Sequence, residues 1–199
     1  MPRINEAAMD VLPDDVAEEL GARGYTKHGE LTWEKVTAHC PQVLKHISML
    51  MKTFASEGTM PKRYVEIAVV AVSRLNACRH CVGRHSVRLA ELGLTHETIA
   101  DILVPEPPGL DAVDILVRDY AVAVSETSDR MRDAIFTSLL EHFDEAQLVE
   151  LTWRVALAGA FNRFNNAMQV DLDEGHLAVL LSQDGKAEML PRSPGDARA

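Results

Sequence analysis

The chain has no long apolar segment. Its longest run of purely apolar residues, at 67–72, is far shorter than the ~20 residues that a membrane-spanning helix needs. The first ten residues include Glu6 and Asp10 and contain no long apolar core, which is not the pattern of a secretory signal. The sequence therefore predicts no membrane association and a cytoplasmic location.

Basic residues are in the minority. Lys and Arg number 20 against 30 Asp and Glu, which gives a formal net charge of −10. A nucleic-acid surface has to be basic to meet the phosphate backbone, so we expect no nucleic-acid partner. Aromatic residues make up only 5%, but 47% of the 199 residues are hydrophobic, which is enough for one buried core.

Cysteine is scarce as well. There are three in the chain, and an odd number without an export signal argues against a framework of structural disulfides. In the reducing cytosol, a Cys-x-x-Cys pair is more often catalytic or metal-binding. Cys78 and Cys81 form such a pair, and Cys40 is interpreted as a small packed apolar residue.

Apolar residues recur at helical spacing along most of the chain, so the sequence predicts an all-α fold. The one ambiguous segment is 61–75, where five β-branched residues would also suit a buried strand. Its length and the proline at its start favour a helix. Residues 1–182 are expected to form one helical domain and 183–199 a mobile tail. The expected helices are 14–20, 31–39, 41–57, 61–75, 77–92, 95–103, 112–126, 130–142, 145–168 and 174–181.

Polar residues and glycines mark several helix ends. Asn76 is the expected N-cap of helix 77–92, and Gly93 ends it. Thr95 caps the next helix, and Asp144 with Gln147 forms a capping box for the long helix 145–168. We also expect a core that contains Met49, Met51, Met60, Leu89 and Leu92.

The Cys-x-x-Cys segment carries the chemistry. At ~100° per residue, Cys78, Cys81 and His85 share one helical face, so the thiols can form a disulfide and His85 can take a proton from Cys81. The helix start favours a thiolate, and Arg79 and Arg84 add positive charge. A thiolate of this kind attacks a peroxide or a disulfide.

Glu66 and His80 complete the candidate site. Glu66 lies in an apolar segment and either bonds to His85, which would raise the basicity of that imidazole, or pairs with Lys62 or Arg63. His80 points to another face, towards a neighbouring helix or a substrate. A zinc site built from Cys78, Cys81 and His85 with Cys40 or His39 would lack the usual second ligand pair, so we expect no metal and no cofactor.

The pattern Glu-x11-Cys-x2-Cys-x3-His, with a histidine directly before the second cysteine, resembles the AhpD-like branch of the carboxymuconolactone decarboxylase family. The residues that satisfy it are Glu66, Cys78, His80, Cys81 and His85. The resemblance covers about 41–103, and residues 160–168 are similar to an Asn-Arg segment in a later helix of peroxidase-related members.

The resemblance implies an all-helical, AhpD-like fold with the Cys-x-x-Cys at the N-terminus of a core helix. It also implies assembly into dimers, trimers or hexamers, and reduction of an organic hydroperoxide with an unidentified dithiol as reductant. In that scheme Cys81 attacks, Cys78 resolves, His85 supported by Glu66 takes the thiol proton, and His80 assists. The alternatives are a lyase like the true lactone decarboxylases, which lack the cysteine pair, and a non-enzymatic redox sensor.

Overall fold

A computed structural model describes residues 2–22 and 32–171, and over these ranges every regular element is a helix. The all-α prediction is confirmed. The expected helix 174–181 and tail 183–199 lie outside the described residues, as does residue 31 of the expected helix 31–39. The elements are η1 (Met9–Val11), α1 (Asp14–Ala22), α3 (Thr32–Thr37), α4 (Pro41–Glu57), α5 (Lys62–Leu75), α6 (Arg79–Glu91), α7 (His96–Ala100), α8 (Ala112–Glu126), η2 (Ser128–Arg130), α9 (Asp133–Leu140) and α10 (Glu145–Met168).

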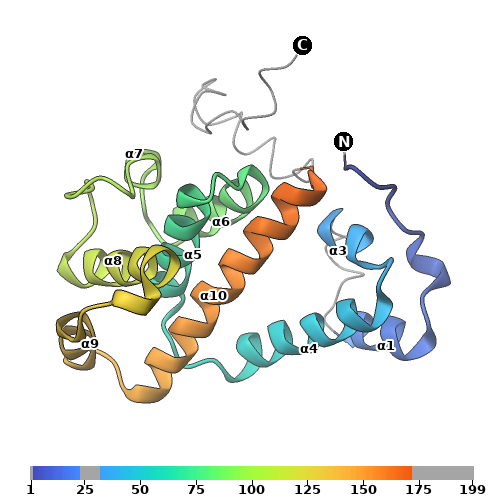
Figure 1. Cartoon of the computed structure of the whole chain (residues 1–199), viewed down its shortest axis with the longest axis horizontal. Coiled ribbons are helices and arrows are strands. Elements are labelled where there is room, and N and C mark those ends of the chain that lie inside the picture. The colour runs from blue at the N-terminus through green and yellow to red at the C-terminus, as the bar shows by residue number, and fades with distance from the viewer. Residues whose placement is uncertain (1, 23–31, 172–199) are drawn as a thin grey trace, which may run out of the picture.

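The long helix α10 separates two groups of helices (Figure 1). On one side α5, α6, α8 and α9 pack with α10 around the larger core, which includes Ile67, Leu89 and Leu151. On the other side α1, α3 and α4 form a smaller core around Val16, Leu44 and other apolar side chains. None of the helices in the described ranges is both long and apolar enough to cross a membrane.

Helix α5 is the central element of the larger core. Its residues 65–73 are all buried, because α6, α8 and α10 each pack against it. A helix enclosed on several sides needs apolar residues all round, which explains the β-branched run that also suited a strand. The helical alternative for 61–75 is the correct one.

Capping residues in the sequence predicted the starts of α10 and α7 correctly. The side chain of Asp144 accepts from the Gln147 N–H and the Gln147 side chain accepts from the Asp144 N–H, so α10 has the expected capping box. Thr95 likewise caps α7. The segment 130–142 was expected to be one helix, but α9 covers only Asp133–Leu140, and Arg130 is the last residue of the 3₁₀ turn η2.

Several expected core positions are wrong. Met49 and Leu92 are 43% and 38% exposed, although Met60 and Leu89 are buried as expected. Helix α4 packs mainly on α1 and α3, and Val43, Met49 and Leu50 lie on its exposed side. Cys40 is exposed rather than packed, because it precedes Pro41 at the start of that helix.

The junction between α5 and α6 differs from the prediction, and the difference changes the positions of the two cysteines in α6. Asn76 caps the end of α5, and Cys78 is the N-cap of α6. The N–H of Cys78 donates to Ser73 O (2.9 Å) and that of Ala77 to Arg74 O (3.1 Å), which is the hydrogen-bond pattern of a Schellman motif. Ala77 adopts the left-handed conformation that this motif requires, with φ = 51°. The two helices therefore follow each other without a loop.

Candidate functional site

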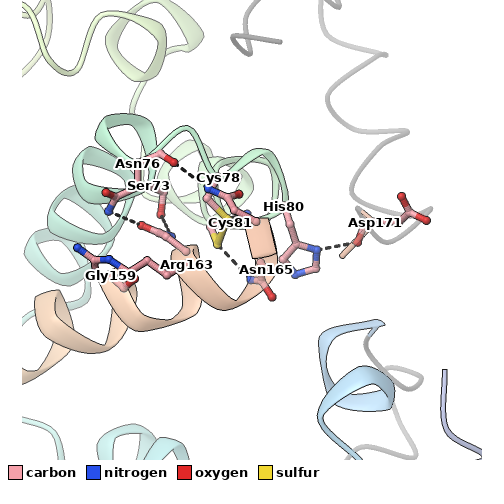
Figure 2. Close-up of a disulfide and its surroundings, with 11 residues drawn as sticks. Ser73, Asn76, Cys78, His80, Cys81, Gly159, Arg163, Asn165 and Asp171 are labelled. Carbon is pink, nitrogen blue, oxygen red and sulfur yellow. Dashed lines mark hydrogen bonds between the residues drawn. A yellow bond between two sulfur atoms is a disulfide. The ribbon is translucent and has the colours of Figure 1, made fainter. Parts of the chain in front are cut away.

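Cys78 and Cys81 are joined by a disulfide at the start of α6, with their Cα atoms 5.3 Å apart (Figure 2). Cys78 is completely buried and Cys81 is 5% exposed. The backbone N–H of Cys81 donates to Sγ of Cys78 across 3.3 Å, so the cysteine itself acts as the capping side chain.

This capping arrangement changes the electrostatics expected from the sequence. With Asn76 as the expected N-cap, Cys78 would be the second helical residue and Cys81 the fifth, but they occupy the N-cap and the third position. The unpaired N–H groups and the positive end of the helix dipole lie in this first turn. Both sulfur atoms are therefore where a helix most favours a thiolate.

Glu66 on α5 reaches across to α6. Its Oε2 lies 2.6 Å from Nδ1 of His85, and its Oε1 accepts from Arg88 across 3.2 Å. Arg63, the surface partner considered for Glu66, instead bonds Asp114 with both ends of its guanidinium. Burial alone would raise the pKa of Glu66, but His85 and Arg88 outweigh it and hold that pKa below its usual value.

His85 is held in the state of a neutral base. Burial lowers the pKa of its imidazole below the ordinary value, and Arg88 and Arg84 act in the same direction against the opposing effect of Glu66. Because the carboxylate of Glu66 accepts from Nδ1, the proton of the neutral ring sits there and Nε2 keeps its lone pair. His85 can therefore accept a proton at Nε2 near neutral pH.

His80 is buried and lies beyond the disulfide (Figure 2). Its Nδ1 is 2.7 Å from the carbonyl oxygen of Asp171, just after the end of α10. A carbonyl can only accept, so this contact also puts the ring proton on Nδ1. The sequence predicted a contact with a neighbouring helix or a substrate, whereas this contact is with backbone just after α10. His39, considered as a zinc ligand, instead contacts Asn5 O through Nε2.

Three asparagines near the end of α10 bond the disulfide or the end of α5, and none of them was singled out from the sequence. Asn165 donates from Nδ2 to Sγ of Cys81 across 3.3 Å. Asn162 bonds Ser73 Oγ and the Asn76 side chain, and Asn166 bonds the Asn76 carbonyl. The only signal was the similarity of segment 160–168 to peroxidase-related proteins, which indicated the segment but not the contacts.

A cavity of about 130 Å³ lies between the two groups of helices. Its apolar wall comes from both groups and includes Trp33 on α3, Phe54 on α4 and Phe161 on α10. Its polar wall consists of Ser73, Glu66, Arg84, Arg88, Arg154, Asn162, Asn165, His80, His85 and Cys81. Cys78 does not line the cavity. The two sulfur atoms thus have different surroundings, since only Cys81 borders a space that a substrate could occupy.

The sequence is similar to one known family. Residues 41–108 match the carboxymuconolactone decarboxylase family, and this range includes the cysteine pair and all of α4 to α7. An uncharacterised protein of Escherichia coli (strain K12), YnjA, is 32% identical over 100 residues, or 50% of this chain and 55% of that protein. YdfG of Bacillus subtilis (strain 168), also uncharacterised, is 24% identical over 136 residues, or 64% and 88% of the two chains. The chain thus spans about half the length of the first of these relatives.

Solved structures share the fold. An uncharacterised peroxidase-related protein of Ralstonia eutropha JMP134, described as an alkylhydroperoxidase AhpD core, superposes with a TM-score of 0.77. It is 20% identical, with 89% of this chain and 95% of that chain covered. The debrominase Bmp8, solved as a cysteine-to-alanine form with 2,3,4-tribromopyrrole, gives a TM-score of 0.69 at 15% identity, with 92% and 99% covered. At these identities the likeness establishes an AhpD-like fold.

Proposed function

This chain is an AhpD-like member of the carboxymuconolactone decarboxylase family, and we propose that it is a thiol-dependent peroxidase that reduces organic hydroperoxides. The observation that carries the proposal is the asymmetry of the cysteine pair. Cys81 borders the cavity together with His85, whereas Cys78 is buried behind it at the helix start. Cys81 can therefore contact a substrate, whereas Cys78 can react only with Cys81.

The first step is oxidation of Cys81. In the reduced protein, Nε2 of His85 takes the thiol proton and leaves a thiolate beside the cavity. The thiolate attacks the terminal oxygen of the hydroperoxide, and the O–O bond breaks. The electron pair of that bond leaves with the alkoxide, which takes the proton from the His85 imidazolium to become an alcohol. Cys81 is left as a sulfenic acid.

The second step joins the cysteines. The Cys78 thiol gives up its proton and its sulfur attacks the sulfur of the Cys81 sulfenic acid. The S–O bond breaks, the hydroxyl takes a proton and leaves as water, and the disulfide forms. The position of Cys78 supports this role, because the N-cap site at the start of α6 favours the thiolate that must attack. His80 borders the same space and is proposed to assist proton transfer there.

An external dithiol then reduces the disulfide and is itself oxidised. The sum is one hydroperoxide and two thiols converted to one alcohol, one water and one disulfide. A cycle that needs reductant after each turnover suits a reducing compartment, which supports the cytoplasmic location expected from the sequence. We also propose that the chain forms a homo-oligomer, and the apolar side chains that α4 exposes, Val43, Met49 and Leu50, support this.

The lining of the cavity favours an organic substrate over hydrogen peroxide. Trp33 and Phe161 meet edge to face with their centroids 5.1 Å apart, and Phe54 lies under the guanidinium of Arg154 at 4.4 Å. An apolar cavity of about 150 Å³ in another protein binds benzene. A cavity of about 130 Å³ therefore suits a small ring or a branched alkyl group.

Reductive dehalogenation is the second candidate. The aromatic side chains in the cavity, Trp33, Phe54 and Phe161, would also suit a halogenated ring such as the one bound by the debrominase of similar fold. Two thiols could supply the two electrons that replace a carbon–bromine bond by carbon–hydrogen, with release of bromide and a proton. A lactone decarboxylase activity would leave the cysteine pair without a role.

The test measures the loss of cumene hydroperoxide with dithiothreitol as reductant. Wild type and Cys40→Ser should turn over, since Cys40 is exposed and does not border the cavity. Cys81→Ser should be inactive. Without dithiothreitol, Cys78→Ser should undergo a single oxidation and leave a sulfenic acid that dimedone labels at Cys81. Turnover by Cys81→Ser would disprove the assignment, and bromide release from a bromopyrrole without peroxide turnover would favour the second candidate.

A further inference from the structure

Asn165 has an amide of which only one end is used by the protein. Its Nδ2 donates to Sγ of Cys81 across 3.3 Å, whereas its Oδ1 is buried and has no hydrogen-bond partner among the described residues. The residue is 4% exposed and borders the cavity. Buried side-chain acceptors are rarely left unpaired, because losing water without gaining a partner is destabilising.

Asn162, one turn earlier on α10, shows what a purely structural asparagine looks like here. Its Nδ2 donates to Ser73 Oγ at 3.1 Å, and its Oδ1 accepts from the Asn76 side chain at 3.1 Å. Both ends of that amide are therefore bonded within the protein. Asn165 also borders the cavity and is nearly as buried, but its oxygen has no partner among the described residues.

We propose that Asn165 positions the hydroperoxide. Its Nδ2 holds the sulfur of Cys81, and its Oδ1 accepts a hydrogen bond from the terminal O–H of the substrate. Because both atoms belong to one rigid planar group, the oxygen that the thiolate attacks is placed beside the sulfur. This inference rests on the proposed peroxidase function and adds the group that recognises the substrate's reactive end.

The hydrogen bond to Oδ1 can persist through the oxygen transfer. When the Cys81 thiolate attacks the terminal oxygen, the O–O bond breaks, and the alkoxide leaves with the electron pair and takes its proton from the His85 imidazolium. The hydrogen on the terminal oxygen is not transferred. It becomes the hydrogen of the sulfenic acid on Cys81, so the same O–H donates to Asn165 in the substrate and in the product. An ester-type peroxide without a terminal O–H would lose this contact.

The experiment isolates Cys81 as the sole thiol in a Cys40→Ser, Cys78→Ser background. Two second-order rate constants are measured at the high-pH plateau, where the thiolate is fully formed: one with cumene hydroperoxide and one with N-ethylmaleimide, which carries no O–H or N–H donor. Replacing Asn165 by Ala should lower the peroxide rate constant about tenfold or more, because positioning effects reach ~10²-fold. The maleimide rate constant should stay within about threefold.

Two further variants test whether the change in the peroxide rate constant depends on the acceptor at Oδ1 of Asn165. Asn165→Asp keeps an acceptor at Oδ1 and loses the donor, so its ratio of peroxide to maleimide rate constants should remain near that of the parent. Asn166→Ala removes an amide that bonds the Asn76 carbonyl and does not border the cavity, and its ratio should be unchanged. If Asn165→Ala does not fold, as judged by circular dichroism, Asn165→Leu replaces it.

Each other result contradicts the inference. An equal fall in both rate constants would make Asn165 a general support of the thiolate and not a substrate-positioning residue. An unchanged peroxide rate constant would remove it from the reaction. If the parent protein reacts with the maleimide and with no hydroperoxide at all, the proposed peroxidase function fails first, and this inference with it.

Discussion

Glu66 and His85 stand nineteen positions apart in the sequence, and their side chains meet across the interface of α5 and α6 with Oε2 and Nδ1 2.6 Å apart. Arg88, almost one turn after His85, contacts the other carboxylate oxygen at 3.2 Å. One carboxylate thus orients the imidazole and balances a guanidinium beside it. The charge on Glu66 and the charge on Arg88 act in opposite directions on the pKa of His85.

Replacing Glu66 by Gln should lower turnover of cumene hydroperoxide at least about tenfold, because general-base assistance is typically worth ~10²–10⁴-fold. The amide keeps the shape but removes the negative charge that supports the imidazolium. The melting temperature should fall by only a few degrees. Glu91→Gln, an exposed site at the end of α6, is the control. Unchanged turnover in Glu66→Gln would leave His85 to act alone.

The pH profile should have an acid limb that belongs to His85. Burial lowers the pKa of His85 below 6.5, so kcat/KM for the hydroperoxide should rise with pH and reach half its plateau below that value. Glu66→Gln should shift the limb to lower pH, since it removes a group that raises this pKa. Arg88→Gln should shift it to higher pH, since it removes a cation that lowers it. Shifts in the same direction would show that the limb reports another group.

The free energy of unfolding should also depend on the titration of His85. Between the lowered pKa of His85 and the ordinary value of 6.5, the unfolded chain binds more protons than the folded one. The free energy of unfolding should therefore rise with pH in that window. Glu66 acts in the same direction at lower pH, because its lowered pKa gives stability above 4.5 that is lost as pH falls through the folded value. Urea titrations at a series of pH values measure both effects.

Two residues with left-handed backbone conformation lie on either side of the cysteine segment, and substitutions at them should change the unfolding free energy in opposite directions. Ala77 has φ = 51° and Gly93 has φ = 89°. A left-handed alanine costs ~1–2 kcal/mol, of which the flexibility of glycine in the unfolded chain would cancel ~0.4–1 kcal/mol. Ala77→Gly should thus raise the unfolding free energy by up to about 1.6 kcal/mol, whereas Gly93→Ala should lower it by a similar amount. Urea denaturation checks both, and a fall in Ala77→Gly would contradict the account.

Filling the cavity should change substrate preference. Ala158 is buried on the cavity wall, so Ala158→Leu should reduce kcat/KM for cumene hydroperoxide about tenfold or more and affect hydrogen peroxide less. Ala160→Leu places the same side chain on the exposed face of α10 and should affect neither. Equal losses for both peroxides would show that the organic group does not occupy this space.

Local signals in the sequence predicted most of the helices. The capping box of Asp144 and Gln147 fixes the start of α10, and Thr95 fixes that of α7, because these side chains bond backbone groups within three residues. The family pattern likewise includes both cysteines, His85 and Glu66. Capping bonds and the spacing of a family pattern can both be recognised within one stretch of sequence.

Contacts between distant segments were not predictable in the same way. Asn76 is a favoured N-cap residue, but its amide bonds Asn162 and its carbonyl accepts from Asn166, both on α10. These bonds make Asn76 the end of α5 and leave Cys78 to cap α6. The contact of Asn165 with Cys81 spans 84 positions and has no local signal beyond a polar residue in a helix.

The burial of Cys78 also sets the order of the proposed catalytic cycle. With no exposed surface on that sulfur, a reductant can reach the disulfide only at Cys81, from the cavity that the hydroperoxide enters. The two substrates would therefore share one entrance and could not be bound together. Alcohol would have to leave before the reductant arrives, which gives ping-pong kinetics with parallel double-reciprocal lines. A large excess of either substrate would compete with the other.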